Sequence, residues 1–221
     1  MSLPPPRGVL LDLDGTLVDT VGTRIDAWLR TFDEFGITAD RGFVAKLIGS
    51  DGKHLTHEVA GKAGARMDGQ LAERIDQRSG EIYSTLNTNP QPLPGVARFL
   101  DAVEAHGLPW AIATSSRREQ VGTSVAALNR AGQPRIVDGT SVKRAKPEPD
   151  LLLAAARELQ LQPSECWCIG DSTWDMRAAV AAGMTPIAVL AGSAVTPDEL
   201  RAAGAAASVR TIDELVAALS A

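Results

Sequence analysis

The second half of the chain alternates short apolar runs with longer stretches of helical periodicity. The apolar runs are bounded by Gly, Ser and Asp and predict strands, and the stretches that follow them predict helices. We expect strands at residues 110–114, 166–170 and 185–190, and helices at residues 117–129, 174–182 and 197–203. The run from Gly8 to Leu13 adds a first strand. Such alternation is typical of a doubly wound parallel sheet covered by helices on both faces.

The pattern changes between the first strand and residue 110. Four segments there have helical periodicity and none reads convincingly as a strand: residues 18–35, 41–48, 53–63 and 71–86. We therefore predict an α/β protein with a doubly wound, Rossmann-like core (residues 1–17 and 93–221) and an inserted all-α cap domain (residues 18–92). Three prolines between Asn89 and Gly95 end the last of these helices and stiffen the return to the sheet.

Two carboxylates follow the first apolar run. Asp12 and Asp14 are two positions apart, so on an extended strand both side chains point to the same side, where the chain turns at Gly15. Like charges held close together repel unless a cation or a shared proton relieves them. The pair indicates either a metal site or a nucleophile with a separate acid/base, and the plain alternative is an ordinary Asp-Gly turn.

Polar residues also follow two other predicted strands. Because ligands of open parallel sheets bind beyond the carboxyl ends of the strands, we expect these residues to meet at one site. Hydroxyls, turn amides and a lysine suit phosphate oxygens, and further carboxylates suit a hard divalent cation. The residues are Thr114, Ser115 and Ser116, then Gly170, Asp171, Ser172 and Asp175, with Lys146 ahead of a Pro-Glu-Pro-Asp segment.

Taken together and in this order, these motifs resemble those of haloacid dehalogenase-like (HAD) superfamily hydrolases, in the group of phosphoglycolate phosphatase and β-phosphoglucomutase. Members of this group carry a helical cap after the first motif. The resemblance covers nearly the whole chain. It rests on residues 12–20 (DLDGTLVDT), 114–116 (TSS), 146–150 (KPEPD) and 170–176 (GDSTWDM).

The resemblance implies a role for each acid. Asp12 would be the nucleophile that forms an aspartyl-phosphate, and Asp14 would protonate the leaving oxygen and then deprotonate the attacking water. Mg²⁺ would be held by the Asp12 and Asp171 carboxylates and the Asp14 backbone carbonyl. Asp175 and Thr16 would contact these ligands without touching the ion.

The resemblance also implies a phosphate site. Thr114 and the Ser115 amide would bind phosphate oxygens, and Lys146 would offset the charge of Asp12 and the charge that develops during transfer. A residue before proline is pushed out of the helical region, so Lys146 is expected in an extended segment, and Asp150 can cap the helix that follows.

The loop at residues 47–53 interrupts the helical insertion with glycines and polar groups. It could face the core site, where such a loop contributes to substrate choice in capped relatives, or it could be a plain turn between helices. Gly49, Ser50 and Lys53 are the candidate specificity residues in the first case.

Asp14 and Arg24 bear on the choice of reaction. Dehalogenases of this family lack an aspartate at the position of Asp14, so its presence implies phosphoryl transfer. Mutases usually carry a histidine where this chain has Arg24. The expected function is therefore a Mg²⁺-dependent phosphatase of phosphoglycolate-phosphatase type acting on a small phosphorylated metabolite. A β-phosphoglucomutase-like phosphotransferase is the first alternative, and a non-catalytic binding protein on the same fold is the second.

Composition and charge limit the partners and the cellular location that we expect for the protein. The 221 residues are 44% hydrophobic, and the net charge of −5 disfavours nucleic acid or an anionic membrane as a partner, because no basic stripe is present to meet phosphates. The sequence shows no signal peptide and no segment long enough to span a bilayer, so we expect a cytoplasmic protein. Cys166 and Cys168 alternate with Trp167 and are expected to lie on one face of a strand as small apolar groups.

Overall fold

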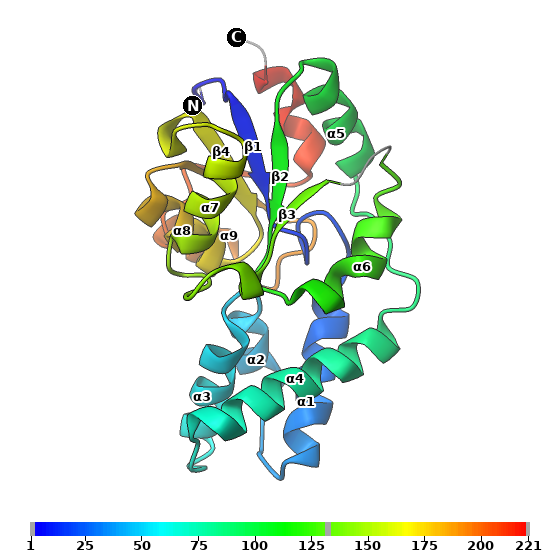
Figure 1. Cartoon of the computed structure of the whole chain (residues 1–221), viewed down its shortest axis with the longest axis vertical. Coiled ribbons are helices and arrows are strands. Elements are labelled where there is room, and N and C mark those ends of the chain that lie inside the picture. Colours follow the sequence, from blue (N-terminus) through cyan, green and yellow to red (C-terminus); the bar gives the residue numbers. More distant parts are fainter. Residues whose placement is uncertain (1–2, 131–133, 220–221) are drawn as a thin grey trace.

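Six parallel strands form a single sheet in the order β3-β2-β1-β4-β5-β6 in the computed structural model, which describes residues 3–130 and 134–219 (Figure 1). The order reverses direction between β1 and β4, as in doubly wound folds, and the predicted fold class is confirmed. The strands are β1 (Gly8–Leu11), β2 (Trp110–Ala113), β3 (Arg135–Val137), β4 (Cys166–Gly170), β5 (Thr185–Val189) and β6 (Ala207–Val209).

Helices cover both faces of the sheet because its strands are apolar on both sides. Val9 and Leu11 of β1 pack on one side with α5 (Val96–Ala105), α6 (Arg118–Ala127) and the 3₁₀ segment η3 (Ile212–Ala218). Leu10 packs on the other side with Cys166 and Cys168, which are buried and free as thiols, and with α7 (Asp150–Glu158) and α8 (Thr173–Ala182). The cysteines therefore lie on one strand face, as predicted. The remaining elements are α9 (Pro197–Ala202), η1 (Gly139–Ser141) and η2 (Pro163–Glu165).

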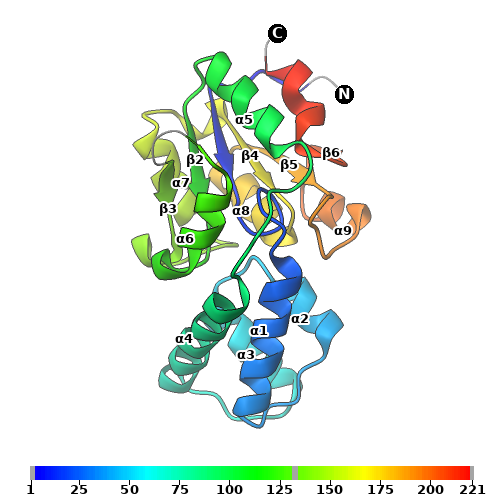
Figure 2. The same ribbon diagram turned by 90° about the vertical axis from the view of Figure 1, so that its right-hand side faces the viewer.

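Four consecutive helices lie apart from the sheet at one end of the molecule (Figures 1 and 2). They are α1 (Val21–Glu34), α2 (Arg41–Leu47), α3 (Gly52–Lys62) and α4 (Gly69–Leu86), and we call residues 21–86 the helical insertion. Aspartates begin three of them, since Asp40, Asp51 and Asp68 each accept a backbone N–H as N-caps. The insertion has its own apolar core, which includes Trp28, Phe32, Val44, Leu55, Val59 and Ile75.

The two connections to the helical insertion run side by side. Val18 forms an isolated antiparallel bridge with Pro92, and the Leu93 amide donates to the Leu17 carbonyl at 3.0 Å. This pairing holds Val18 against the returning chain, and α1 begins at Val21 and not at residue 18. The domain limits predicted from the sequence stay a prediction, and their core segments include residues 1–2, 131–133 and 220–221, which lie outside the described residues.

Several elements differ from the sequence prediction. Strands β3 and β6 were not expected, because each has only three residues and most of these are partly exposed. Helix α5 was likewise unassigned. The predicted cap on α7 is wrong: the helix begins at Asp150 itself, and the Asp150 carboxylate accepts a hydrogen bond from Arg144 instead. Within the described residues, no helix combines the length and apolar character that crossing a membrane requires.

The packing of α5 on the sheet can be tested by a matched pair of substitutions. Val103→Ala removes two buried methyl groups on α5, and we expect it to lower the free energy of unfolding by about 1.5 to 3 kcal/mol. Val180→Ala on α8 makes the same change at a side chain that is 54% exposed and should cost less than about 0.5 kcal/mol. Both valines lie in helices, so the change in helix propensity cancels. Equal losses in urea denaturation would contradict the packing described.

Candidate active site

Four carboxylates are buried where β1 and β4 end: Asp12, Asp14, Asp171 and Asp175, all at most 8% exposed. The strand register aligns them. Leu11 of β1 pairs with Ile169 of β4, and the Asp12 amide continues the ladder to the Ile169 carbonyl at 2.9 Å. The residues that follow these strands therefore lie at one level of the sheet edge, as expected for a ligand site of an open parallel sheet.

Lys146 is the cation at the centre of this group. Its ammonium lies 2.6 Å from an Asp12 oxygen and 2.6 Å from an Asp175 oxygen, and it donates to the Ala113 carbonyl at 2.7 Å. The side chain is 1% exposed. Burial alone would lower the pKa of Lys146, but the charges of Asp12 and Asp175 outweigh it and raise the pKa, so the lysine stays charged. The expected pairing of Lys146 with Asp12 is present.

One lysine does not balance the acids around it. Oxygens of Asp12, Asp171 and Asp175 lie within 4.8 Å of one another. Burial raises the pKa of Asp12 to about 7, although Lys146 opposes this, and burial with repulsion from Asp175 and Asp12 raises the pKa of Asp171 well above its usual value. Such carboxylates, which offer only oxygen ligands, fit a hard divalent cation such as Mg²⁺.

Neighbouring residues hold the acids of this cluster in place. The Thr16 hydroxyl donates to Asp171 Oδ1 at 3.0 Å, and Gly15 has a φ of +83° that brings the backbone against the Asp171 carboxylate, where a Cβ would have no room. Asp175 accepts bonds from the amide and hydroxyl of Ser172 in the capping box that starts α8. Thr16 thus contacts Asp171, and Asp175 is itself one of the three clustered acids, so whether Asp175 touches the ion stays a prediction.

Asp14 has a different environment, to which the helical insertion contributes Arg24 and Tyr83. Its Oδ2 accepts two bonds from the Arg24 guanidinium, at 3.1 Å from Nε and 2.9 Å from Nη2, and a third from Ser116 Oγ at 2.9 Å. Its Oδ1 accepts bonds from the hydroxyls of Thr20 and Tyr83. Burial would raise the pKa of Asp14, but the charge of Arg24 and these hydrogen bonds outweigh it and lower the pKa.

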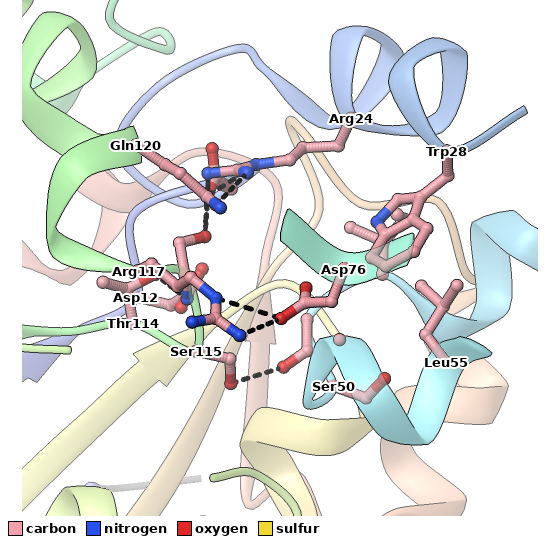
Figure 3. A pocket seen from close by; sticks show the side chains of 15 residues that line it. Asp12, Arg24, Trp28, Ser50, Leu55, Asp76, Thr114, Ser115, Arg117 and Gln120 are labelled. Atoms are coloured by element: carbon pink, nitrogen blue, oxygen red, sulfur yellow. Dashed lines mark hydrogen bonds and ion pairs between the residues drawn. The ribbon is translucent and has the colours of Figure 1, made fainter. Parts of the chain in front are cut away.

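A cavity of about 60 Å³ lies between the helical insertion and the sheet end. Asp12, Asp14, Thr114 and Ser115 line it from the sheet side, and Arg24 and Trp28 line it from α1 (Figure 3). Its volume is enough for a phosphate-sized group or a few waters. Thr114 and Ser115, which the sequence predicted for phosphate, therefore line one small cavity. Lys146 does not line it but contacts Asp12, which does.

The helical insertion is seated directly on this cavity. Arg117, just before α6, pairs with Asp76 of α4 at 2.6 Å (Figure 3) and with Glu73 of the same helix at 2.7 Å. The Ser115 hydroxyl donates to the Gly49 carbonyl at 3.0 Å. Farther out, Lys46 pairs with Glu199 at 2.8 Å. The insertion is thus bonded to the sheet part on several sides of the site.

Of the three candidate residues in the loop at residues 47–53, two line the cavity and one does not. Gly49 and Ser50 line the cavity, and Gly49 has a φ of +93° in a close approach to Ser172 that leaves no room for a Cβ. Lys53 does not line it. Asp51 caps α3, and Lys53 extends toward α4, where its ammonium lies 3.6 Å from Glu73.

Several cavity residues were not singled out as site residues from the sequence. Arg24 was noted only as the occupant of a mutase histidine position, and the others are Trp28, Asp76, Arg117 and Gln120. One signal was available for Arg24: it is a charged residue on the buried side of α1, between Val21 and Trp28. Gln120 and Asp76 lie on helices with ordinary polar patterns and Arg117 lies just before α6, so only tertiary structure brings them here.

Comparison with known proteins identifies the family. The family model described as haloacid dehalogenase-like hydrolase matches residues 9–189, which include all four motifs. This chain belongs to the haloacid dehalogenase-like hydrolases. The resemblance predicted from the sequence, and with it an enzyme of this family, is confirmed.

Individual relatives within the haloacid dehalogenase-like hydrolases agree with this result. The chain is 33% identical over 187 residues to hexitol phosphatase A of Escherichia coli, covering 83% of this chain and 82% of the relative. It is 31% identical to a plasmid-encoded phosphoglycolate phosphatase of Cupriavidus necator, covering 98% and 94%. A β-phosphoglucomutase of Bacillus subtilis also matches, at 28% identity over 83% of each chain. The crystal structure of a hydrolase from Pseudomonas syringae superimposes with a TM-score of 0.90 at 30% identity, covering 95% of this chain and 96% of that one.

The buried charge of Lys146 gives a prediction about stability. Replacing it by Met leaves Asp12 and Asp175 buried without their cation, so we expect Lys146→Met to lower the free energy of unfolding by about 3 to 5 kcal/mol at pH 8 without metal. Lys143→Met, an exposed position in the same loop, is the control and should change it by less than about 0.5 kcal/mol. Chemical denaturation measures both, and an equally small effect at the two sites would contradict the electrostatic role of Lys146.

Proposed function

We propose that the protein is a Mg²⁺-dependent phosphatase that hydrolyses a small phosphorylated metabolite through an aspartyl-phosphate. The observation that carries this proposal is Asp12: a buried carboxylate, held by Lys146, that opens into a phosphate-sized cavity beside Thr114 and Ser115. A carboxylate fixed in this way has one oxygen neutralised and the other free to attack. Family membership and the named phosphatases among its relatives support the same reaction class.

The proposed reaction has two steps. In the first, an Asp12 oxygen attacks phosphorus while the bond from phosphorus to the ester oxygen breaks, and Asp14, which must first take up a proton, gives that proton to the leaving oxygen. In the second, water attacks the aspartyl-phosphate, Asp14 accepts a proton from the water, and inorganic phosphate leaves with Asp12 restored. Thr114 and the Ser115 amide bind the phosphoryl oxygens, and Lys146 offsets the negative charge that accumulates around Asp12.

The acidic cluster would hold the metal. Asp12 and Asp171 would supply carboxylate oxygens and Asp14 its backbone carbonyl. Thr16 and Asp175 would orient these ligands without contacting the ion, Thr16 through its hydrogen bond to Asp171. When bound, Mg²⁺ supplies positive charge that draws the phosphate group and the nucleophile together.

The helical insertion acts as a cap in this proposal. Residues 18–92 form the cap domain and residues 1–17 and 93–221 the core, and the paired connections at residues 18–20 and 91–93 form the hinge. Closure places Gly49 and Ser50 at the cavity and excludes water. Lys53 contributes only indirectly, because its partner Glu73 also holds Arg117.

A matched set of variants tests the phosphatase proposal. Purified protein with Mg²⁺ should release inorganic phosphate from p-nitrophenyl phosphate or from small phosphorylated metabolites. Asp12→Asn should abolish this release, and Asp14→Asn should lower kcat by about 10²- to 10⁴-fold. Asp19→Asn alters an exposed acid of the same segment and serves as the control. Turnover that survives Asp12→Asn would contradict the proposal.

The same assay separates the mutase alternative. A mutase would convert β-glucose 1-phosphate to glucose 6-phosphate without net phosphate release, and a phosphatase would release phosphate from either. Arg24, paired with Asp14 where mutases usually have a histidine, favours the phosphatase.

The raised pKa values of the clustered acids predict how the stability of the folded protein depends on pH, with and without Mg²⁺. The folded protein retains the Asp12 proton to about pH 7, whereas an unfolded chain releases it near pH 4, so stability from this group is lost as pH rises through that window. Asp171, with its pKa also raised, acts in the same direction. Without metal, we therefore expect these acids to lower Tm between pH 5 and pH 8, and Mg²⁺ should restore Tm most at pH 8.

The size of this effect follows from mass action. At 100 times its Kd, Mg²⁺ adds about 2.7 kcal/mol, or roughly 5 to 10 °C in Tm for a chain of this length. Circular dichroism measures it, with Asp171→Asn as the variant in which the Mg²⁺ effect should shrink. The metal assignment is wrong if Mg²⁺ shifts Tm equally at pH 5 and pH 8, or does not shift it at all.

A further inference from the structure

Arg24 is a buried cation that the proposed reaction leaves without a role. Its side chain is 10% exposed, its guanidinium lies 3.4 Å from the centre of the Tyr83 ring, and its one carboxylate contact is Asp14. The other two partners are neutral: Gln120 Oε1 at 3.0 Å from Nη1 and Ser116 Oγ at 2.8 Å from Nη2. The ring and the neutral partners fix the orientation of the guanidinium, and Asp14 supplies its charge balance.

Asp14 cannot keep these contacts and also serve the leaving oxygen. Both of its oxygens are fully engaged, Oδ2 by Arg24 and Ser116 and Oδ1 by Thr20 and Tyr83. To reach the substrate, the carboxylate must turn away from Arg24. A buried guanidinium would then be left without an anion, which is strongly unfavourable unless another anion takes the vacated place.

The second arginine at the cavity does not share this situation. Arg117 pairs with both Asp76 and Glu73, and neither acid has a part in the proposed chemistry. Among the described residues that line the cavity, Arg24 is therefore the cation whose acid partner is needed elsewhere during turnover.

We propose that Arg24 is the specificity residue for a second anionic group on the substrate, which takes the place of Asp14 on the guanidinium and so releases Asp14 to the leaving oxygen. This inference rests on the proposed phosphatase function. It names the substrate class as a short phosphate monoester that also carries a carboxylate or a second phosphate.

Geometry limits the length of this substrate. Asp12 and Arg24 line the same cavity of about 60 Å³, with Thr114 and Ser115 beside Asp12 and Trp28 beside Arg24 (Figure 3). In this closed arrangement, a phosphate held at Asp12 and an anion held at Arg24 leave room for only a few intervening atoms. An anion on a long or branched substrate would not reach Arg24 with the insertion seated.

Matched substrates test the proposal directly. Phosphoglycolate and 3-phosphoglycerate carry a carboxylate, and 2-hydroxyethyl phosphate and glycerol 3-phosphate have a neutral hydroxymethyl group in its place. We expect the wild-type protein to favour the acids by about 10- to 100-fold in kcat/KM, the range for a hydrogen-bonded ion pair. Arg24→Gln should remove most of this preference, mainly through a higher KM for the acids. Arg24→Lys, which keeps the charge, should restore part of it.

Controls separate recognition from folding. Arg30→Gln makes the same change at an exposed position of α1 and should leave the acid preference unchanged. Circular dichroism checks that each variant is folded. If Arg24→Gln does not fold, Arg24→Lys and the wild-type preference still decide the matter, because a wild-type protein without preference for the acids overturns the proposal.

A structure tests the exchange of partners. In crystals of Asp12→Asn with phosphoglycolate and Mg²⁺, the carboxylate should contact Arg24 and the Asp14 side chain should have left it. An Arg24 still bonded to Asp14, with the carboxylate elsewhere, would overturn the exchange.

The outcomes also separate this inference from the function on which it rests. Asp12-dependent phosphatase activity in which Arg24→Gln reduces acids and neutral esters in the same proportion refutes the specificity role and leaves the phosphatase intact. Absence of any Asp12-dependent phosphate release refutes both.

Discussion

The charge balance of four buried carboxylates is the constraint on which the rest of this structure depends. Asp12, Asp14, Asp171 and Asp175 lie at the ends of two adjacent strands, and in the described residues Lys146 and Arg24 are the cations that contact them. Two negative charges remain when all four acids are ionised. The raised pKa values of Asp12 and Asp171 are the response of the metal-free protein, and a divalent cation would supply the missing charge.

The two cations divide the site into two parts. Lys146 comes from the sheet part and pairs with Asp12 and Asp175, so the proposed nucleophile and the acidic cluster have their cation without the helical insertion. Arg24 comes from the insertion and pairs with Asp14, so the cation that balances the proposed acid/base is in place only when the insertion is seated, while Thr20 and Ser116 contact Asp14 from outside the insertion. In the proposed mechanism this division would link the position of the insertion to proton transfer, because movement of α1 would change the surroundings of Asp14 and leave the contact between Asp12 and Lys146 in place.

Local sequence patterns predicted the sheet part well. Strand β4 has the predicted limits, and β1, β2 and β5 differ by two residues or fewer at their carboxyl ends, because buried parallel strands are continuous apolar runs with clear boundaries. The edge strands β3 and β6 escaped detection since three residues carry too little pattern. The start of α1 was misplaced because pairing of Val18 with Pro92 depends on a contact across more than 70 residues, which no local pattern encodes.

In the site, too, the residues in local motifs could be predicted and those brought in by distant contacts could not. Asp12, Asp14 and Asp171 lie in short motifs that follow predicted strands, so the sequence pattern placed them together, and the family resemblance added Lys146. The surroundings of Asp14 could not be predicted, because Tyr83, Ser116 and Arg24 come from three separate elements. Lys53 shows the converse: its place in a polar loop suggested the cavity, but the N-cap formed by Asp51 sets the start of α3, and Lys53 extends from it toward α4.

The central claim is that a divalent cation balances the buried acids. The number of protons released when Mg²⁺ binds at pH 7 tests it most directly, measured by titration calorimetry in buffers of different ionisation enthalpy. The account predicts that Mg²⁺ binding releases protons, because Asp12 and Asp171 must ionise to bind it, and that fewer are released in Asp171→Asn. Mg²⁺ binding without proton release, or no binding, would contradict it.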